Sequence, residues 1–147
     1  MRDREVILIF KNILVPLDGS PASLRALDLA IEIAMRDGSK ITLVYVIINP
    51  SGINTKTLED MKCVGEKILC EGESICKQYG IITRKIIRIA EANQSSVAME
   101  IYDEVIKGKY DLVILGSRGY TGEKAILMGS VAMSLAITLP CTIIIVR

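Results

Sequence analysis

The chain has 147 residues, half of them apolar, and 18 basic and 17 acidic side chains that leave a formal net charge of +1. This length suits one domain with a substantial core, while the near-neutral charge and the scarcity of aromatic residues argue against nucleic-acid binding. The apolar runs are too short to span a bilayer, and no small-residue cleavage site follows the run at 6–10, so we expect a cytoplasmic protein without a signal peptide.

The side chains that usually bind zinc or carry out nucleophilic catalysis are few. Histidine is absent, which excludes Ser-His and Cys-His catalysis within one chain. The cysteines form no CxxC pair, so we expect them to pack in or beside the core; they are Cys63, Cys70, Cys76 and Cys141.

The first part of the chain predicts a buried strand followed by a helix. Residues 6–10 either extend this strand backward or pack on the surface, and the apolar run 13–17 has the composition of a buried parallel strand. A turn leads to a helix that Ser20 caps and Gly38 ends. Its apolar residues recur at helical spacing: Leu24, Leu27, Ile31, Ala34 and Met35.

A second strand and a long helix come next. The run 41–48 is rich in β-branched residues, which favours a central strand. The helix that follows ends at Gly80, and its glycines Gly65 and Gly72 either permit close packing or mark a break. Its predicted apolar stripe contains Leu58, Met61, Val64, Ile68, Ile75 and Tyr79.

The second half of the chain continues the alternation of strands and helices. The stretch 82–90 alternates charged residues with isoleucines, which indicates an edge strand with one wet face. The remaining elements are a helix at 97–108, a strand at 112–115, a helix at 131–138 and a final strand at Thr142–Val146.

This alternation predicts an α/β fold, an open doubly wound five-stranded parallel sheet with helices on both faces. In the strand order 3-2-1-4-5, the winding reverses between the first and fourth strands. Their carboxyl ends carry Asp18 and Gly116, so the sequence places two polar loops at one crevice.

The glycine-rich segment 116–130 connects the fourth strand to the last helix. Strand, glycine-rich loop and helix start can bind phosphate, because the helix start offers unpaired N–H groups and the positive end of the dipole. A surface loop with Ser130 as a helix cap is the alternative. The segment matches neither GxxxxGK[ST] nor GxGxxG, and the turn after the first strand suits neither a flavodoxin nor a response-regulator receiver.

The spacing of Gly116, Gly119, Gly129 and Ser130 resembles the ATP-binding motif of universal stress proteins, and the opening stretch 12–20 resembles that family's first strand and turn. The resemblance covers 11–147, as a single universal stress protein domain, and leaves 1–10 as an N-terminal extension. It implies an adenine nucleotide alpha hydrolase-like fold and adenine nucleotide binding.

The resemblance also implies which residues hold the nucleotide. Phosphates and ribose would lie against Gly116, Gly119, Gly129, Ser130 and Val131, with Leu115 flanking them. Pro16, Asp18 and Val46 would line the adenine and ribose side, and Asp18 would reach a Mg²⁺ or Mn²⁺ ion on the phosphates. A turn residue that caps local amides is the alternative role of Asp18.

One stretch departs from the family pattern. After the third strand the family often has Gly, a small residue and Pro, whereas this chain has Glu91, Ala92, Asn93 and Gln94. We therefore expect a different wall on that side of the pocket.

Binding is better supported by the sequence than catalysis. Arg118 and Lys124 either neutralise phosphate charge or are solvated, and no positioned base or transition-state clamp is evident. We therefore expect an ATP-binding, nucleotide-responsive module of the stress response without catalytic residues. The alternatives are a slow ATP hydrolase that uses the same pocket and a scaffold protein that binds no nucleotide.

The last strand predicts a partner. Thr142–Val146 is hydrophobic and forms an edge in the predicted order, and such an edge invites pairing with another chain. The family resemblance likewise implies a homodimer through this strand. The alternative is that residues 6–10 cover the edge.

Overall fold

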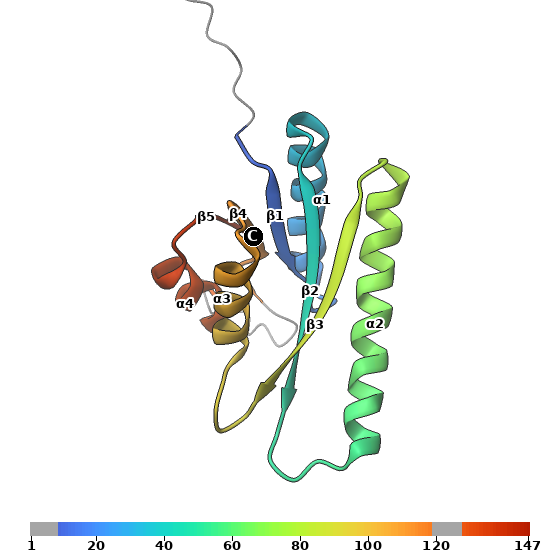
Figure 1. Cartoon of the computed structure of the whole chain (residues 1–147), viewed down its shortest axis with the longest axis vertical. Coiled ribbons are helices and arrows are strands. Elements are labelled where there is room, and N and C mark those ends of the chain that lie inside the picture. Colours follow the sequence, from blue (N-terminus) through green and yellow to red (C-terminus); the bar gives the residue numbers. More distant parts are fainter. Residues whose placement is uncertain (1–8, 119–127) are drawn as a thin grey trace, which may run out of the picture.

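The computed structural model describes residues 9–118 and 128–147. Strands and helices alternate along the chain, and all strand pairs in the sheet are parallel. The elements are β1 (Asn12–Pro16), α1 (Pro21–Asp37), β2 (Lys40–Asn49), α2 (Thr55–Gln78), β3 (Thr83–Glu91), α3 (Val97–Gly108), β4 (Leu112–Gly116), α4 (Ser130–Thr138) and β5 (Thr142–Val146). The sheet order β3-β2-β1-β4-β5 confirms the predicted topology (Figure 1).

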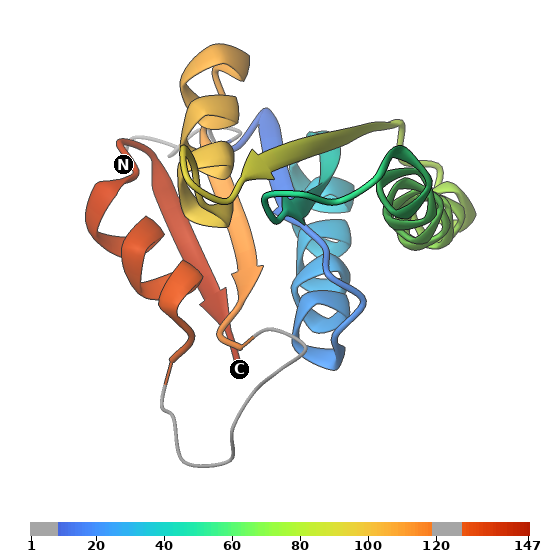
Figure 2. The same ribbon diagram turned by 90° about the horizontal axis from the view of Figure 1, so that it is seen from below.

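Helices cover both faces of the sheet and divide the core into two clusters. One cluster joins the sheet to α1 and α2 and contains Ile13, Leu27 and Leu43, and the other joins it to α3 and α4 and contains Leu14, Val44 and Leu135 (Figure 2). Successive strand residues face opposite sides of a sheet, which is why Ile13 and Leu14 belong to different clusters. In α1, Leu27 and Ile31 are buried as predicted, whereas Leu24 and Met35 are exposed.

β2 and β3 are both longer than β1 and extend past its carboxyl end. The pairing of β1 with β2 stops at Pro16 and Val44, but β2 continues to Asn49 and remains paired with β3 as far as Glu91. The sheet therefore has an overhang next to the carboxyl end of β1.

The long helix α2 packs through its glycines. Its buried residues are Gly65, Leu69, Gly72 and Cys76, whereas Val64 and Tyr79 of the predicted stripe are each 53% exposed. A Cβ atom on Gly65 would lie 2.5 Å from the Tyr45 ring, and one on Gly72 would lie 2.8 Å from Leu17. Close packing is thus the correct reading of these glycines, and the predicted stripe is right for Ile68 and Ile75, which pack against the core, and wrong for Val64 and Tyr79.

β3 is an edge strand, as predicted, but two of its four charged residues, Lys85 and Arg88, are paired with helices. Arg88 donates to Glu100 at 2.9 Å and to Glu104 at 3.0 Å, both on α3, and Glu104 also accepts from the Tyr110 hydroxyl at 2.9 Å. Burial raises the pKa of Tyr110, whose hydroxyl therefore stays protonated in this network. On the other face Lys85 pairs with Glu73 of α2 at 3.1 Å, so neither face of β3 is fully wet.

Phe10 packs against the core cluster on the α1 side, ahead of β1. Its N–H donates to Asp37 at 3.3 Å, and its carbonyl accepts from the Ser39 hydroxyl at 2.7 Å. The neighbouring Arg36 guanidinium lowers the pKa of Asp37. Residues 1–8 lie outside the described residues, so both the extension at 1–10 and its covering of the β5 edge stay predictions.

Among the described residues, no helix has the length and apolar character needed to cross a membrane.

Candidate functional site

The candidate site lies at the carboxyl ends of β1 and β4, the two central strands. They pair with each other, while α1 lies on one face of the sheet and α4 on the other. The winding of the sheet reverses between them, and ligands of open α/β sheets bind at this position. In Figure 2 the arrowhead of β4 marks this end, near the label of the C-terminus.

Asp18 follows β1 and has an exposed side chain. Its Oδ1 accepts a hydrogen bond from the Ser20 N–H at 2.8 Å, which is the local turn predicted as the alternative role. No partner is recorded for Oδ2 within ranges 9–118 and 128–147. One oxygen of the carboxylate thus shapes the turn, and the other remains available to a ligand.

Gly116 ends β4 where the first turn of α1 crosses it. A Cβ atom at this position would lie 2.8 Å from the Ala22 carbonyl carbon and 2.9 Å from the Ser23 nitrogen. Its φ is not positive, so the glycine serves the close approach of α1 rather than a sharp turn. Packing of α1 therefore requires glycine here, a demand that the sequence analysis did not consider.

Ser117 and Gly129 bring the two ends of the glycine-rich segment together. The Gly129 N–H donates to the Ser117 carbonyl at 2.6 Å, and the Ser117 N–H donates to the Val146 carbonyl at 2.6 Å. Ser117 is buried, and sequence analysis missed its role, although its place directly after β4 was a usable signal.

α4 starts at Ser130 with Gly129 as its N-cap and no side-chain cap hydrogen bond. Ser130 is therefore the first helical residue and not the cap, which corrects the alternative reading of this loop. Helix starts leave several N–H groups without partners inside the helix. The first turn of α4 contains no acidic residue, so nothing there competes with an anion for the positive end of the dipole.

The overhang of β2 presents unpaired backbone beyond the end of β1. Val44 accepts from the Leu17 N–H at 2.9 Å, so Val44 points its polar backbone groups toward β1. Because alternate residues of a strand point these groups to the same side, Val46 and Ile48 direct theirs into the space beyond β1. The side chains of Val46, Ile48 and Pro16 lie on the α3–α4 face of the sheet.

Ile48 is 57% exposed and was missed by sequence analysis. The period of two residues from Val46 could have found it, because residues two apart in a strand share a face.

The other predicted site residues differ in how exposed their side chains are. The side chain of Leu115 is only 4% exposed and packs in the core between the sheet and α3–α4, and Val131 packs against that core. Arg118 is exposed directly after Ser117. Gly119 and Lys124 lie outside the described residues.

The stretch that departs from the family pattern is tied to the loop after β2. Asn49 donates to both carboxylate oxygens of Glu91, at 3.2 and 2.9 Å, and Asn93 donates to the Ser51 hydroxyl at 2.7 Å. These side-chain pairs link the two loops at the tip of the overhang.

Two of the four cysteines pack in the core. Cys76 is buried against α1 and β2, and burial raises the pKa of its thiol to about 11; Cys141 packs against the other core cluster. The expectation of core packing is wrong for Cys63 and Cys70, which are exposed on α2.

Comparison with known proteins identifies the family. The model of the Universal stress protein family matches residues 9–147. The universal stress protein MJ0531 of Methanocaldococcus jannaschii is 29% identical over 147 residues, which cover 95% of this chain and 83% of that protein.

Two solved structures are similar in fold. A universal stress protein in complex with cAMP has a TM-score of 0.74 at 22% identity, with 95% of this chain and 98% of that chain covered. The universal stress protein of Archaeoglobus fulgidus in complex with dAMP has a TM-score of 0.71 at 18% identity, with 95% and 99% covered. With a family match that spans residues 9–147, this chain belongs to the universal stress protein family.

Proposed function

We propose that this protein binds ATP at the carboxyl ends of β1 and β4 and acts as a nucleotide-responsive regulatory module in the stress response. The observation that carries the proposal is the start of α4, which has neither a side-chain cap nor an acidic residue in its first turn and lies beside the ends of the central strands. Adenine nucleotides in the similar cAMP and dAMP complexes support the ligand class.

The phosphates would bind at the start of α4. The N–H groups of Ser130 and Val131 lie in its first turn, where the helix dipole favours negative charge. Arg118 directly follows Ser117, at the other end of the glycine-rich segment 116–130. Its side chain is exposed and adds positive charge at the same end of the sheet.

The overhang of β2 would read the base. Adenine offers a ring-nitrogen acceptor next to an amino donor, and one strand residue offers the matching N–H and C=O. Val46 directs these groups into the space beyond β1, and the apolar side chains of Val46 and Ile48 suit the face of a purine.

Asp18 fits the role of a ligand to a divalent ion. Mg²⁺ in nucleotide sites takes few protein carboxylates and fills its remaining positions with phosphate oxygens and water. The exposed carboxylate of Asp18 supplies such an oxygen at the site. A bound ion would neutralise phosphate charge there.

Isothermal titration calorimetry with ATP and Mg²⁺ tests the proposal, combined with identification of any nucleotide released on denaturation. We expect wild-type protein to bind ATP and the Gly129→Asp variant to lose at least tenfold in affinity, because a carboxylate would then oppose the phosphates. Gly129 has φ −69°, which any residue adopts, so the variant is expected to fold.

Gly129→Ala is the matched control, since it adds a Cβ atom without charge. Flat calorimetry for the wild type with and without Mg²⁺ would overturn the proposal. A turnover assay on the same samples separates binding from slow hydrolysis, with Asp18→Ala as its control.

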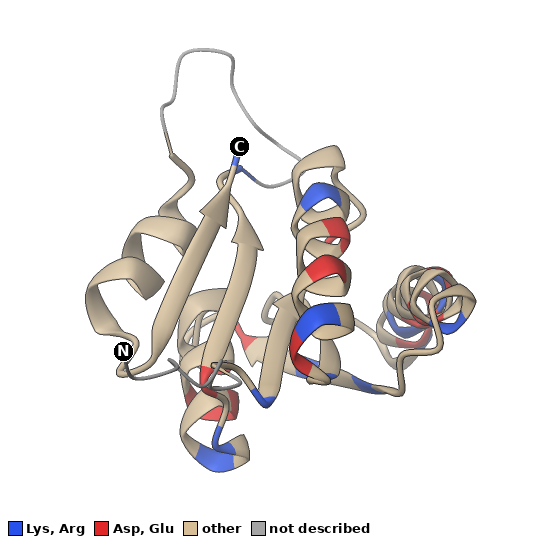
Figure 3. Ribbon diagram, turned by 90° about the horizontal axis from the view of Figure 1, so that it is seen from above, with Lys and Arg blue, Asp and Glu red and all other residues tan. Residues whose placement is uncertain are grey.

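A homodimer through β5 belongs to this proposal. The strand Thr142–Val146 pairs only with β4 in the described sheet and carries no charged side chain (Figure 3). Its free edge offers backbone groups to a second copy.

A further inference from the structure

The amino ends of the strands, opposite the candidate nucleotide site, form a second surface with a chemistry of its own. The parallel register aligns the strand starts, since Asn12 pairs with Lys40 and Ile41 pairs with Thr83. Figure 1 shows the starts of β1, β2 and β3 and the ends of α1 and α2 at the top of the view. We define the amino-end face as the stretches 9–12, 35–40, 77–84 and 107–112.

The amino-end face is strongly basic. It contains seven basic and two acidic residues, in a chain whose totals are 18 and 17. One base, Arg36, is paired with Asp37 at 2.7 Å. The other six are exposed and form no ion pair or side-chain hydrogen bond with another residue of the ranges 9–118 and 128–147. They are Lys11, Lys40, Lys77, Arg84, Lys107 and Lys109.

The two acidic residues of this face are engaged with the backbone. Asp37 accepts a hydrogen bond from the Phe10 N–H at 3.3 Å. Asp111 accepts from the N–H groups of Lys11 at 2.8 Å and of Asn12 at 3.0 Å. Both carboxylates thus hold the entry of the chain into β1, and the basic side chains around them keep their charge for an external anion.

The helix dipole explains only part of this charge. Arg36, Lys77 and Lys107 lie in the last turns of α1, α2 and α3, where the negative end of the dipole favours a base. Lys40 and Arg84 lie at the starts of strands, where no such dipole acts. Their presence is therefore not accounted for by the stability of a helix.

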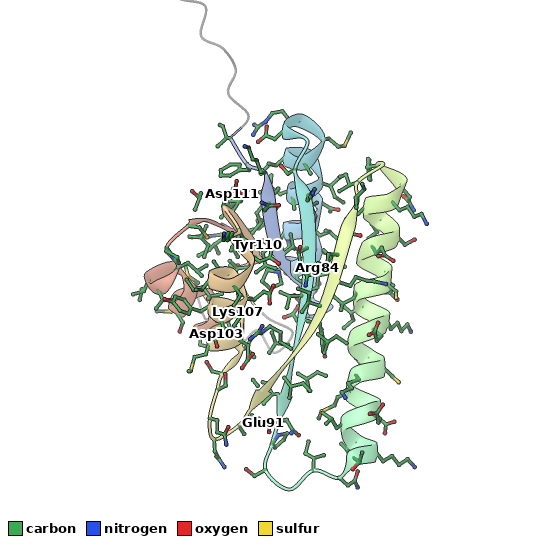
Figure 4. All side chains as sticks on the ribbon, in the orientation of Figure 1. Arg84, Glu91, Asp103, Lys107, Tyr110 and Asp111 are labelled. Carbon is green, nitrogen blue, oxygen red and sulfur yellow. The ribbon has the colours of Figure 1, made fainter. Side chains whose placement is uncertain are left out.

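Several of the bases are neighbours across the sheet. The Lys40 N–H donates to the Lys11 carbonyl at 2.8 Å, which places these two residues side by side. Arg84 pairs with Thr42, and residues two apart in a strand share a face, so Lys40 and Arg84 lie on the face that α3 covers. Lys107 lies on the same side of the sheet, in the last turn of α3 (Figure 4). The bases therefore form a row across the strand starts.

Large apolar side chains are exposed among these bases. Ile82 is 80% exposed, Ile9 64%, Met35 59% and Tyr79 53%. They come from three separate connections: the segment before β1, the end of α1 and the turn between α2 and β3. Exposed apolar side chains interspersed with bases suit the boundary of an anionic bilayer, where headgroups attract the bases and the acyl region accepts the apolar tips.

We propose that the amino-end face docks on an anionic lipid bilayer as a peripheral contact. The six bases lie against the headgroups, and the side chains of Ile82 and Ile9 enter the boundary between headgroups and acyl chains. The aliphatic stems of the lysines lie along the same boundary while their ammonium groups stay in water. A nucleic acid would leave the apolar side chains without a partner, and an acidic peptide would need them gathered in one groove.

This contact uses the opposite ends of the strands from the candidate nucleotide site. A docked molecule keeps the carboxyl ends of β1 and β4, with Asp18 and the start of α4, away from the lipid surface. The inference therefore does not rest on the proposed function, and it uses neither the β5 edge nor bound nucleotide.

Co-sedimentation of the full chain with vesicles tests the proposal. We expect binding to vesicles of phosphatidylcholine and phosphatidylglycerol in equal parts, no binding to phosphatidylcholine alone, and release at high salt. Lys40→Gln with Arg84→Gln is expected to weaken binding about thirtyfold, because two charges leave the surface. Lys56→Gln with Lys67→Gln is the matched control, since both lysines are exposed on α2 outside this face.

A fluorescent side chain tests whether the apolar tips enter the bilayer. The chain contains no tryptophan, so Ile82→Trp introduces a single reporter at the amino-end face. We expect its emission to shift to shorter wavelength when anionic vesicles are added, because the indole leaves water. Val64→Trp is the matched control and is expected not to shift, since Val64 is 53% exposed on α2 away from this face.

The proposal is overturned if the full chain stays in the supernatant with anionic vesicles at low salt. It is also overturned if the folded Lys40→Gln, Arg84→Gln variant binds like the wild type, or if the Ile82→Trp emission does not move in bound protein. Binding to a duplex DNA oligonucleotide without binding to vesicles has the same meaning. Circular dichroism verifies the fold of each variant, and calorimetry with ATP reports separately on the proposed nucleotide site.

Discussion

Gly116 and Gly129 stand at opposite ends of one loop and serve different purposes. Gly116 lies under the first turn of α1, where a Cβ atom would come within 2.8 Å of Ala22, so packing alone demands glycine. Gly129 has an ordinary φ of −69° as the N-cap of α4. Packing therefore explains glycine at 116, whereas the backbone conformation does not require it at 129.

We predict that Gly116→Ala destabilises the fold by about 1 to 3 kcal/mol, the usual cost of forcing an extra carbon into a packed contact. Gly129→Ala should change stability by less than about 0.5 kcal/mol. Urea unfolding followed by circular dichroism measures both. Equal midpoints for Gly116→Ala and wild type would show that α1 can move aside.

At the scale of elements, α2 packs on the sheet through a buried face that has two glycines in place of larger side chains. Gly65 meets the ring of Tyr45, and Gly72 meets Leu17 and Leu43. The helix thus lies closer to the sheet than a helix with side chains at these positions could. Because a hydrophobic pattern gives no weight to glycine, the stripe inferred from the sequence contained Ile68 and Ile75 of the packed face but not its buried glycines.

We predict that Gly65→Ala is destabilising in the wild type, although glycine-to-alanine changes inside a helix usually stabilise by about 1 kcal/mol. Here the added Cβ atom would lie 2.5 Å from the Tyr45 ring, so the change in the free energy of unfolding becomes unfavourable. In a Tyr45→Ala background the same change should become stabilising. A double-mutant cycle in urea measures this coupling, and an effect of the same sign in both backgrounds would contradict the prediction.

The identity and order of the elements follow from the sequence, but their lengths and partners do not. Alternating strand and helix patterns predicted a doubly wound parallel sheet, and the structure confirms both this and the strand order 3-2-1-4-5 that we expected for it. The overhang of β2 over β1 was not predicted, because the apolar run at 41–48 sets a strand but not its register. The ion pairs of Arg88 with Glu100 and Glu104 join residues of different elements, which local patterns do not reveal.

The candidate site, like the fold, was predicted from the sequence only in part. The sequence placed Asp18 and Gly116 at neighbouring strand ends, and the pairing of β1 with β4 brings those ends together. The sequence did not predict the backbone contacts of Ser117, because they depend on where β5 ends relative to β4. It did not predict the exposure of Ile48 either, because that depends on where β2 ends relative to β1. The binding roles of the residues stay predictions until nucleotide is measured.

At the scale of the whole molecule, β5 is the edge strand through which the sheet would continue into a second copy. The Val146 carbonyl accepts from the Ser117 N–H, so Val146 points its backbone groups toward β4. By alternation, Ile143 and Ile145 point theirs outward, toward the space a second copy would fill.

We predict that Ile143→Pro halves the particle mass, because proline removes an outward N–H while the bonds to β4 remain. Light scattering measures the mass, and circular dichroism verifies the fold. Deleting residues 1–10 is the companion experiment. If the full-length chain does not pair through β5 and only the truncated chain does, the N-terminal residues cover the edge.

The hydrogen bond between Gly129 and Ser117 has a consequence for how this protein can be altered. It holds together Ser117 and Gly129, the residues on either side of segment 118–128. A change in the length of the segment therefore need not move the sheet or α4. Closing a flexible loop of twice the length costs only about 0.6 kcal/mol more. The position is therefore a suitable point for inserting a foreign domain, such as a fluorescent reporter, whose signal would test for occupancy of the proposed nucleotide site.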